Sequence, residues 1–150
     1  MVDKNKLNKK AIIIGLLTDM VGSIVASFII TVTAAAIIVR NLAITEPGLK
    51  LTEIDAPIEQ QLTASIGFNF SLLFAGLFFT VLGGYIAAKI AKIAELKHAL
   101  AVGILSLLTG GLIAVIFRIP IKNWFDWSCY LLTIPLALLG GYIRMKTKKG

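Results

Sequence analysis

Four long apolar stretches constrain the fold of this chain more than any other feature. A transmembrane α-helix needs about 20 mainly apolar residues, and each stretch approaches or exceeds that length. Asp19 is the only acidic or basic residue inside them. The predicted spans are residues 11–39, 62–88, 99–117 and 127–143. The sequence therefore predicts an all-α membrane protein, with one four-helix transmembrane domain over residues 1–150.

The composition agrees with this interpretation and leaves little room for anything else. Hydrophobic residues make up 57% of the chain and charged residues only 15%, with a mean hydropathy of +0.88. A soluble domain has about 25% charged residues. The connectors are residues 40–61, 89–98 and 118–126, so a separate catalytic domain is not expected.

The basic residues predict how the chain is oriented. Eleven of the 15 Lys and Arg residues fall on one side of the predicted membrane, namely Lys4, Lys6, Lys9, Lys10, Lys89, Lys92, Lys97, Arg144, Lys146, Lys148 and Lys149. Lys and Arg are enriched in cytoplasmic loops, so both termini and the 89–98 loop are predicted to be cytoplasmic. The net charge of +7 lies at the ends of apolar runs, where it meets lipid head groups, and nucleic acid is not expected as a partner.

Asp19 lies eight residues, about 12 Å, after Ala11, within the first predicted span. An ionised acid there costs about 2.5 to 3.5 kcal/mol on insertion scales, so Asp19 must be protonated or find a partner. The neutral partners available are Thr18, Ser23, Ser27, Thr80, Tyr85, Ser106 and Thr109, and the predicted polar site is Asp19, Ser23, Ser27 and Thr80. Three interpretations stay open: a proton or cation pathway, a contact with a base of a partner subunit, or a structural hydrogen bond that sets helix register.

Small residues recur at helical spacing in all four spans. In lipid, such residues let helices approach closely, which compensates for the weak hydrophobic force between them. The predicted packing positions are Gly22, Gly76, Gly83, Gly84, Gly103, Gly110, Gly140 and Gly141. These residues form one small-residue face on each helix. They predict either a compact bundle with all of these faces inward or a bundle with one face left for a neighbouring protein.

The pentapeptide Leu-Gly-Gly-Tyr-Ile occurs twice, at residues 82–86 and 139–143. Both copies lie near the predicted cytoplasmic end of a span. Ala11, Gly15 and Gly22 also align with Ala99, Gly103 and Gly110 at one constant offset. The chain could thus consist of two tandem parallel helical hairpins; the alternative is that such segments are common in membrane helices.

The two outer connectors carry further local signals. Residues 46–48 (Glu-Pro-Gly) form a turn signal, while Asp55 as N-cap and Pro57 predict that the second helix starts before the membrane. Trp124, Trp127 and Tyr130 are typical of an interfacial aromatic belt, with a ligand-binding aromatic cage as the alternative.

No set of catalytic side chains is apparent. The chain has one histidine, His98, and one cysteine, Cys129, and it lacks paired carboxylates, a Ser-His-Asp set and metal-ligand spacing. We therefore expect no enzyme activity, no metal and no cofactor. His98 is predicted to be a solvated residue of the cytoplasmic turn; the functional alternative is a pH-sensing role.

Residues 83–89 (Gly-Gly-Tyr-Ile-Ala-Ala-Lys) and 97–103 (Lys-His-Ala-Leu-Ala-Val-Gly) resemble a motif found in a loose group of small bacterial four-helix inner-membrane proteins. The group has a Gly-Gly-aromatic-Ile-Ala-Ala-base segment, a short cytoplasmic turn and a His-small-Leu-x-x-Gly helix start. Because the activity of the group is itself unknown, the resemblance implies topology and a bacterial inner membrane, and no chemistry.

Two functional hypotheses follow. The first is a non-enzymatic multi-pass protein of the lipid bilayer that self-associates or serves as an accessory subunit of another membrane protein. The alternative is a small transporter or channel component in which Asp19 is a proton or cation site.

Overall fold

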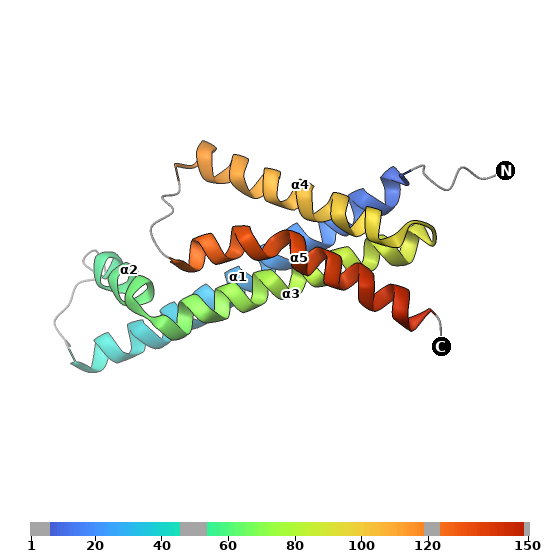
Figure 1. The fold of residues 1–150 in the computed structure, drawn as a ribbon. Helices are drawn as coiled ribbons and strands as arrows, with labels where there is room; N and C mark the ends of the chain where they lie inside the picture. Colours follow the sequence, from blue (N-terminus) through green and yellow to red (C-terminus); the bar gives the residue numbers. More distant parts are fainter. Residues whose placement is uncertain (1–6, 46–53, 119–123, 149–150) are drawn as a thin grey trace.

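The computed structural model describes residues 7–45, 54–118 and 124–148 and is all-helical there (Figure 1). Its helices are α1 (Lys9–Thr45), α2 (Asp55–Ala64), α3 (Ile66–Ala91), α4 (Glu95–Ile116) and α5 (Trp124–Thr147). All except α2 are long and apolar enough to cross a membrane. The described residues confirm the predicted all-α architecture with four long apolar helices able to span a membrane, which is typical of a multi-pass membrane protein.

The two ends of the bundle differ in character. The first residues of α1, the turn between α3 and α4 and the last residues of α5 lie together at one end, and α2 lies at the other (Figure 1). We call these the basic end and the loop end, because Lys89, Lys97 and Lys148 gather at the first. The predicted basic residues Lys4, Lys6 and Lys149 and the turn at 46–48 lie outside the described residues.

Helix α1 is longer than the span predicted for it. Its 37 residues correspond to about 55 Å, whereas the apolar core of a bilayer is about 30 Å thick. The helix therefore tilts or extends beyond the membrane, as the length of the predicted span already indicated.

The second predicted span is interrupted where a continuous helix was expected. Ser65 has an extended backbone, with φ −75° and ψ 109°, and separates α2 from α3. Its Oγ accepts a hydrogen bond from the backbone N–H of Phe68 at 3.3 Å, so Ser65 is the N-cap of the spanning helix. The prediction of Asp55 as N-cap was wrong: Ile54 occupies that position, and Asp55 lies in the first turn of α2.

Glycine contacts join the helices in the half of the bundle nearer the basic end. A Cβ on Gly15 would lie 2.7 Å from the carbonyl oxygen of Gly83, and one on Gly84 or Gly140 would meet the backbone of the facing helix. Around them the side chains of Ala11, Ala87, Ala88, Ala99, Val102 and Ala137 are fully buried. Helices α1, α3, α4 and α5 are therefore in close backbone contact there, which is how association in lipid is stabilised.

The remaining predicted packing positions fall into two groups. Gly22 lies against the ring of Phe79, Gly103 against Ala137 and Gly141 against Ala99. Gly76 and Gly110, by contrast, have no atom of the described chain within 4 Å of a Cβ position. The packing role predicted for these two glycines is therefore not seen within the described chain.

His98 is buried, which corrects the prediction that it is solvated. Its ring is only 2% exposed, because the N-terminus of α1 packs over it. Nε2 accepts a hydrogen bond from the backbone N–H of Asn8 at 2.7 Å, and Nδ1 lies 3.0 Å from the carbonyl oxygen of Ala94. In the neutral tautomer with a proton on Nδ1 both nitrogens are paired, and His98 fixes the start of α1 to the start of α4.

Replacing His98 with leucine is expected to lower the free energy of unfolding by about 1 to 3 kcal/mol. The backbone N–H of Asn8 would then lose its acceptor in a part-buried site, and the buried space of the imidazole ring would be repacked. Thermal unfolding in mild detergent measures the loss. His98→Gln offers a replacement acceptor and serves as the control, and equal stability of the leucine variant and the wild type would contradict the assignment.

Candidate functional site

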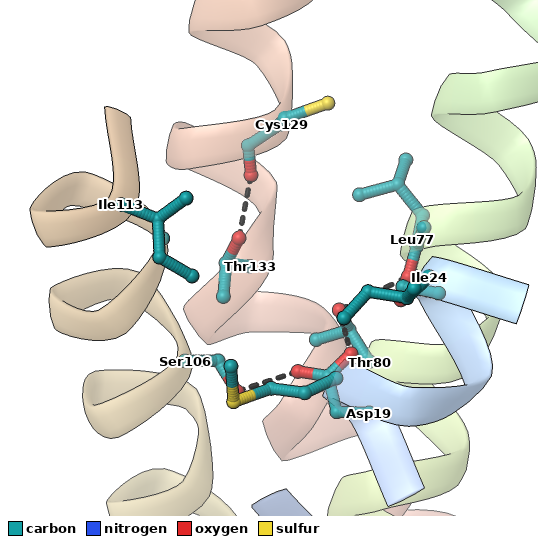
Figure 2. A pocket seen from close by; sticks show the side chains of 12 residues that line it. Asp19, Ile24, Leu77, Thr80, Ser106, Ile113, Cys129 and Thr133 are labelled. Carbon is teal, nitrogen blue, oxygen red and sulfur yellow. Dashed lines mark hydrogen bonds between the residues drawn. The ribbon is translucent and has the colours of Figure 1, made fainter. Parts of the chain in front are cut away.

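The site is formed around the carboxyl group of Asp19. The Asp19 side chain is 5% exposed and accepts hydrogen bonds from two other helices. Thr80 Oγ1 on α3 lies 3.0 Å from Oδ1, and Ser106 Oγ on α4 lies 2.5 Å from Oδ2 (Figure 2). Thr80 Oγ1 is also 3.1 Å from the carbonyl oxygen of Gly76, so its one hydrogen is shared between two acceptors. The carboxyl group thus joins α1, α3 and α4.

The three side chains lie at one level of the bundle. Asp19 is 10 residues from the basic end of α1, and Thr80 and Ser106 are each 11 residues from the basic ends of their helices. At 1.5 Å per residue these separations are about 15 to 17 Å. Half the thickness of an apolar bilayer core is about 15 Å. With the basic ends of these helices placed at one boundary of the apolar core, the Asp19 carboxyl group would lie about half-way across it.

A cavity of about 250 Å³ begins at this carboxyl group and is open on one side. From the level of Asp19 the cavity extends toward the loop end, because Ile24, Ile113 and Cys129, which also line it, lie nearer to the loop end of their helices than Asp19 does (Figure 2). Helices α1, α3, α4 and α5 contribute the lining residues Asp19, Met20, Ser23, Ile24, Gly76, Leu77, Thr80, Ser106, Gly110, Ile113, Cys129 and Thr133. Asp19 is the only Asp, Glu, Lys, Arg or His residue among them.

The opposite side of the carboxyl group is closed. A Cβ on Gly83 would lie 3.0 Å from the Cβ of Asp19, so the backbone of α3 packs directly beside it. One turn nearer the basic end, Gly15, Ala87 and Val102 are in mutual contact. These contacts close the side of the carboxyl group that faces the basic end.

The structure brings together part of the predicted polar site. Asp19, Thr80 and Ser23 all line the cavity, whereas Ser27 is not among its lining residues. Of the other hydroxyl groups considered as partners, Ser106 reaches the carboxyl group, while Thr18 and Thr109 donate to the backbone carbonyls of their own helices. The spacing of these hydroxyl residues in the sequence does not show which of them contacts Asp19, since each lies on an apolar helix.

The cavity has further lining residues that the sequence analysis did not single out as a site. Met20, Leu77 and Ile113 supply apolar surface, and Thr133 and Cys129 come from α5. The Thr133 hydroxyl donates to the Cys129 carbonyl oxygen at 2.6 Å. Gly76 and Gly110, which make no helix contact in the described chain, form part of the same lining. The spacing of the lining residues in the sequence does not indicate a cavity.

The aromatic residues at the loop end form a separate cluster. Trp124 and Trp127 are 62% and 58% exposed. Trp124 stacks on Phe125 with ring centroids 4.0 Å apart, and Phe70 of α3 packs edge-on against Phe125 at 4.9 Å. The exposure of the indole rings at the end of a spanning helix is typical of an interfacial belt.

The described residues hold no group of three His, Cys, Asp or Glu side chains that could bind a metal ion. Comparison with protein-family models, with curated proteins and with solved structures finds no match to this chain.

Proposed function

We propose that this protein is a non-enzymatic accessory subunit of a membrane complex, and that its partner docks at the Asp19 cavity. We place it in a bacterial inner membrane with both termini in the cytoplasm, so that the cavity opens toward the outer leaflet. The observation that carries the proposal is a buried carboxyl group on a helix able to span a membrane, at one end of a cavity.

In the described part of the chain, the hydrogen-bond partners of this carboxyl group are the neutral side chains of Thr80 and Ser106, and no ion pair with a base is seen. Every Lys, Arg and His in the sequence lies before, after or near the end of a spanning helix. The two neutral hydroxyl groups donate hydrogen bonds and leave the charge of an ionised carboxylate uncompensated. A lysine, arginine or histidine side chain entering the cavity would compensate it in a medium where an unpaired charge is costly.

The same distribution of bases argues for a different protein and against a second copy as the occupant. A second copy has no base at mid-membrane level to place opposite Asp19. An α-helix is about 10 Å wide with its side chains, so a cavity of about 250 Å³ admits one long side chain and not a whole helix. The partner is therefore a membrane protein with a basic residue inside a spanning helix.

The cavity rim suits the approach of such a helix. Gly76 of α3 and Gly110 of α4 line the cavity and have no neighbour of the described chain within 4 Å of a Cβ position. Small residues without a partner allow the backbone of a neighbouring helix to come close. Together with the acid at the closed end, they indicate the face on which the partner packs.

Replacing Gly110 with leucine is expected to reduce recovery of the partner at least tenfold, because the new side chain fills the cavity. Gly111→Leu is the matched control: Gly111 is also free of neighbours within 4 Å in the described chain, but it does not line the cavity. Pull-down from the native membrane in mild detergent, with quantitative mass spectrometry, measures the difference. Equal losses for the two variants would contradict docking at the cavity.

A second candidate function is a component of a small transporter or channel. It is favoured by the opening of the cavity to one side, which would let a proton or cation reach Asp19. The contacts around Gly15 and Gly83 would then have to open to complete a pathway. Proton and cation uptake into liposomes containing the purified protein tests this function: uptake that is lost in Asp19→Asn supports it, and absence of uptake in the wild type excludes it.

A further inference from the structure

The lining of the Asp19 cavity divides into a polar end and an apolar wall. Asp19, Thr80 and Ser106 supply side-chain oxygens at one end, and Ser23 adds a hydroxyl group one turn farther along α1. The Thr133 hydroxyl is turned to the backbone of its own helix. The apolar wall consists of Met20, Ile24, Leu77 and Ile113. A ligand that matches this lining has one polar, charged end and an apolar stem.

The Asp19 carboxyl group keeps hydrogen-bonding capacity for such a ligand. An ionised carboxylate has about four lone-pair sites. Thr80 donates to Oδ1 and Ser106 donates to Oδ2, so one hydroxyl group from a different helix contacts each oxygen. Ser23 lies four residues after Asp19, on the same side of α1. Its Oγ is therefore a further acceptor for a group that enters the cavity and contacts the carboxylate.

An ammonium group fits this arrangement better than a guanidinium group. Ammonium carries three N–H donors on one terminal atom, whereas guanidinium spreads five donors over three nitrogens in a rigid planar fork. A fork that binds both carboxylate oxygens competes with the Thr80 and Ser106 hydroxyl groups for the same two atoms. Its Nε lies on the stem, beside the apolar wall. A buried N–H without an acceptor weakens binding about fivefold or more.

An imidazolium group is a poorer match for a related reason. Its two N–H groups lie on opposite sides of a ring, so that when one donates to Asp19 the other points toward another part of the lining. The ring also has no long apolar stem to lie against Ile24 and Leu77.

We propose that the Asp19 cavity selects a primary ammonium group on an unbranched alkyl stem, and that the base of the docked partner is therefore a lysine. This inference rests on the proposed docking function. The ammonium group donates to Asp19 and Ser23, while the methylene groups of the stem contact the apolar wall, as long basic side chains do when they cover apolar surface.

The first test uses small probes and needs no partner. The purified full-length protein in mild detergent is titrated with n-butylammonium, which reproduces the lysine side chain, and with n-butylguanidinium, which has the same stem. Ligand-observed NMR gives the dissociation constants, and Asp19→Asn in the same detergent serves as the blank for uptake into micelles. We expect n-butylammonium to bind the wild type about tenfold or more tightly than n-butylguanidinium, because two further N–H groups lack acceptors in the latter.

A matched pair of serine variants tests the position of the bound ammonium group. Ser23→Ala removes an acceptor and is expected to weaken n-butylammonium binding about fivefold or more. Ser27→Ala removes a hydroxyl group from the same helix outside the cavity lining, and it is expected to bind the probe like the wild type. This pair also decides the matter if Asp19→Asn fails to fold.

The second test uses the complex. When the partner's lysine is changed to arginine, recovery of the partner is expected to fall about tenfold or more, although the charge is kept. Equal affinity for the two probes, equal effects of the two serine variants, or a partner whose base at Asp19 is arginine or histidine would overturn the selection of ammonium. Absence of any complex of the wild type would instead contradict the docking function itself, so the two failures are distinguishable.

Discussion

Replacing Gly84 with leucine is expected to prevent stable assembly of the bundle. A Cβ at this position would meet the carbonyl group of Ala137, so backbone opposes the new side chain and α3 and α5 must separate. Overpacking a core costs about 1 to 3 kcal/mol when side chains can adjust, and we expect about 3 kcal/mol or more where they cannot. Unfolding in mixed detergent micelles, followed by tryptophan fluorescence, measures the change.

Gly67→Leu is the matched control for this substitution. Gly67 also lies in α3, but no atom of the described chain is within 4 Å of its Cβ position. Its leucine variant is expected to unfold within about 0.5 kcal/mol of wild type, as is usual for exposed positions. Similar stability of the Gly84 and Gly67 variants would mean that α3 and α5 do not meet through their glycines.

The second large effect is expected from Asp19→Asn, which abolishes the charge and keeps the size of the side chain. We expect the bundle to stay folded, because the Asn carbonyl oxygen can still accept a hydrogen bond from Thr80 or Ser106. Recovery of the partner, in contrast, is expected to fall at least 100-fold, since breaking a buried ion pair by removing one member costs about 3 to 5 kcal/mol.

Two measurements on the same preparations separate the possible outcomes of this substitution. Thermal unfolding of the purified variant shows whether the bundle is intact, and quantitative mass spectrometry shows whether the partner is still bound. A variant that unfolds like wild type and keeps its partner would mean that the charge of Asp19 takes no part in docking. Early unfolding together with partner loss would mean that Asp19 acts through helix register instead.

The spanning helices could be predicted from the sequence, because their positions follow from the hydropathy and length of the apolar stretches and depend little on tertiary contacts. The break at Ser65 could not be predicted with the same ease. Residues 62–64 are mostly apolar and continue the hydropathy of the third helix, so only the capping of Phe68 N–H by Ser65 marks the boundary. A serine preceding an apolar run was the available signal.

The acidic residue of the candidate site could be predicted from the sequence, but its hydrogen-bond partners could not. Asp19 is conspicuous because it is the only charge within the apolar spans. Its partners Thr80 and Ser106 were two among several hydroxyl groups, and the rotation of each helix about its axis decides between them. The burial of His98 depends on where the N-terminus of α1 lies, which is 90 residues away in the sequence and leaves no local pattern.

The most direct test of the proposed function is native mass spectrometry of the wild-type protein and of Asp19→Asn, each extracted from its own membrane in mild detergent. We predict a complex of fixed stoichiometry between the wild type and a different membrane protein. The sequence of that partner carries a Lys, Arg or His within a spanning helix, and the complex is absent for Asp19→Asn and after neutral substitution of the partner's base. A wild-type protein that is only monomeric or homo-oligomeric, or a complex that survives both substitutions, would contradict docking at the Asp19 cavity.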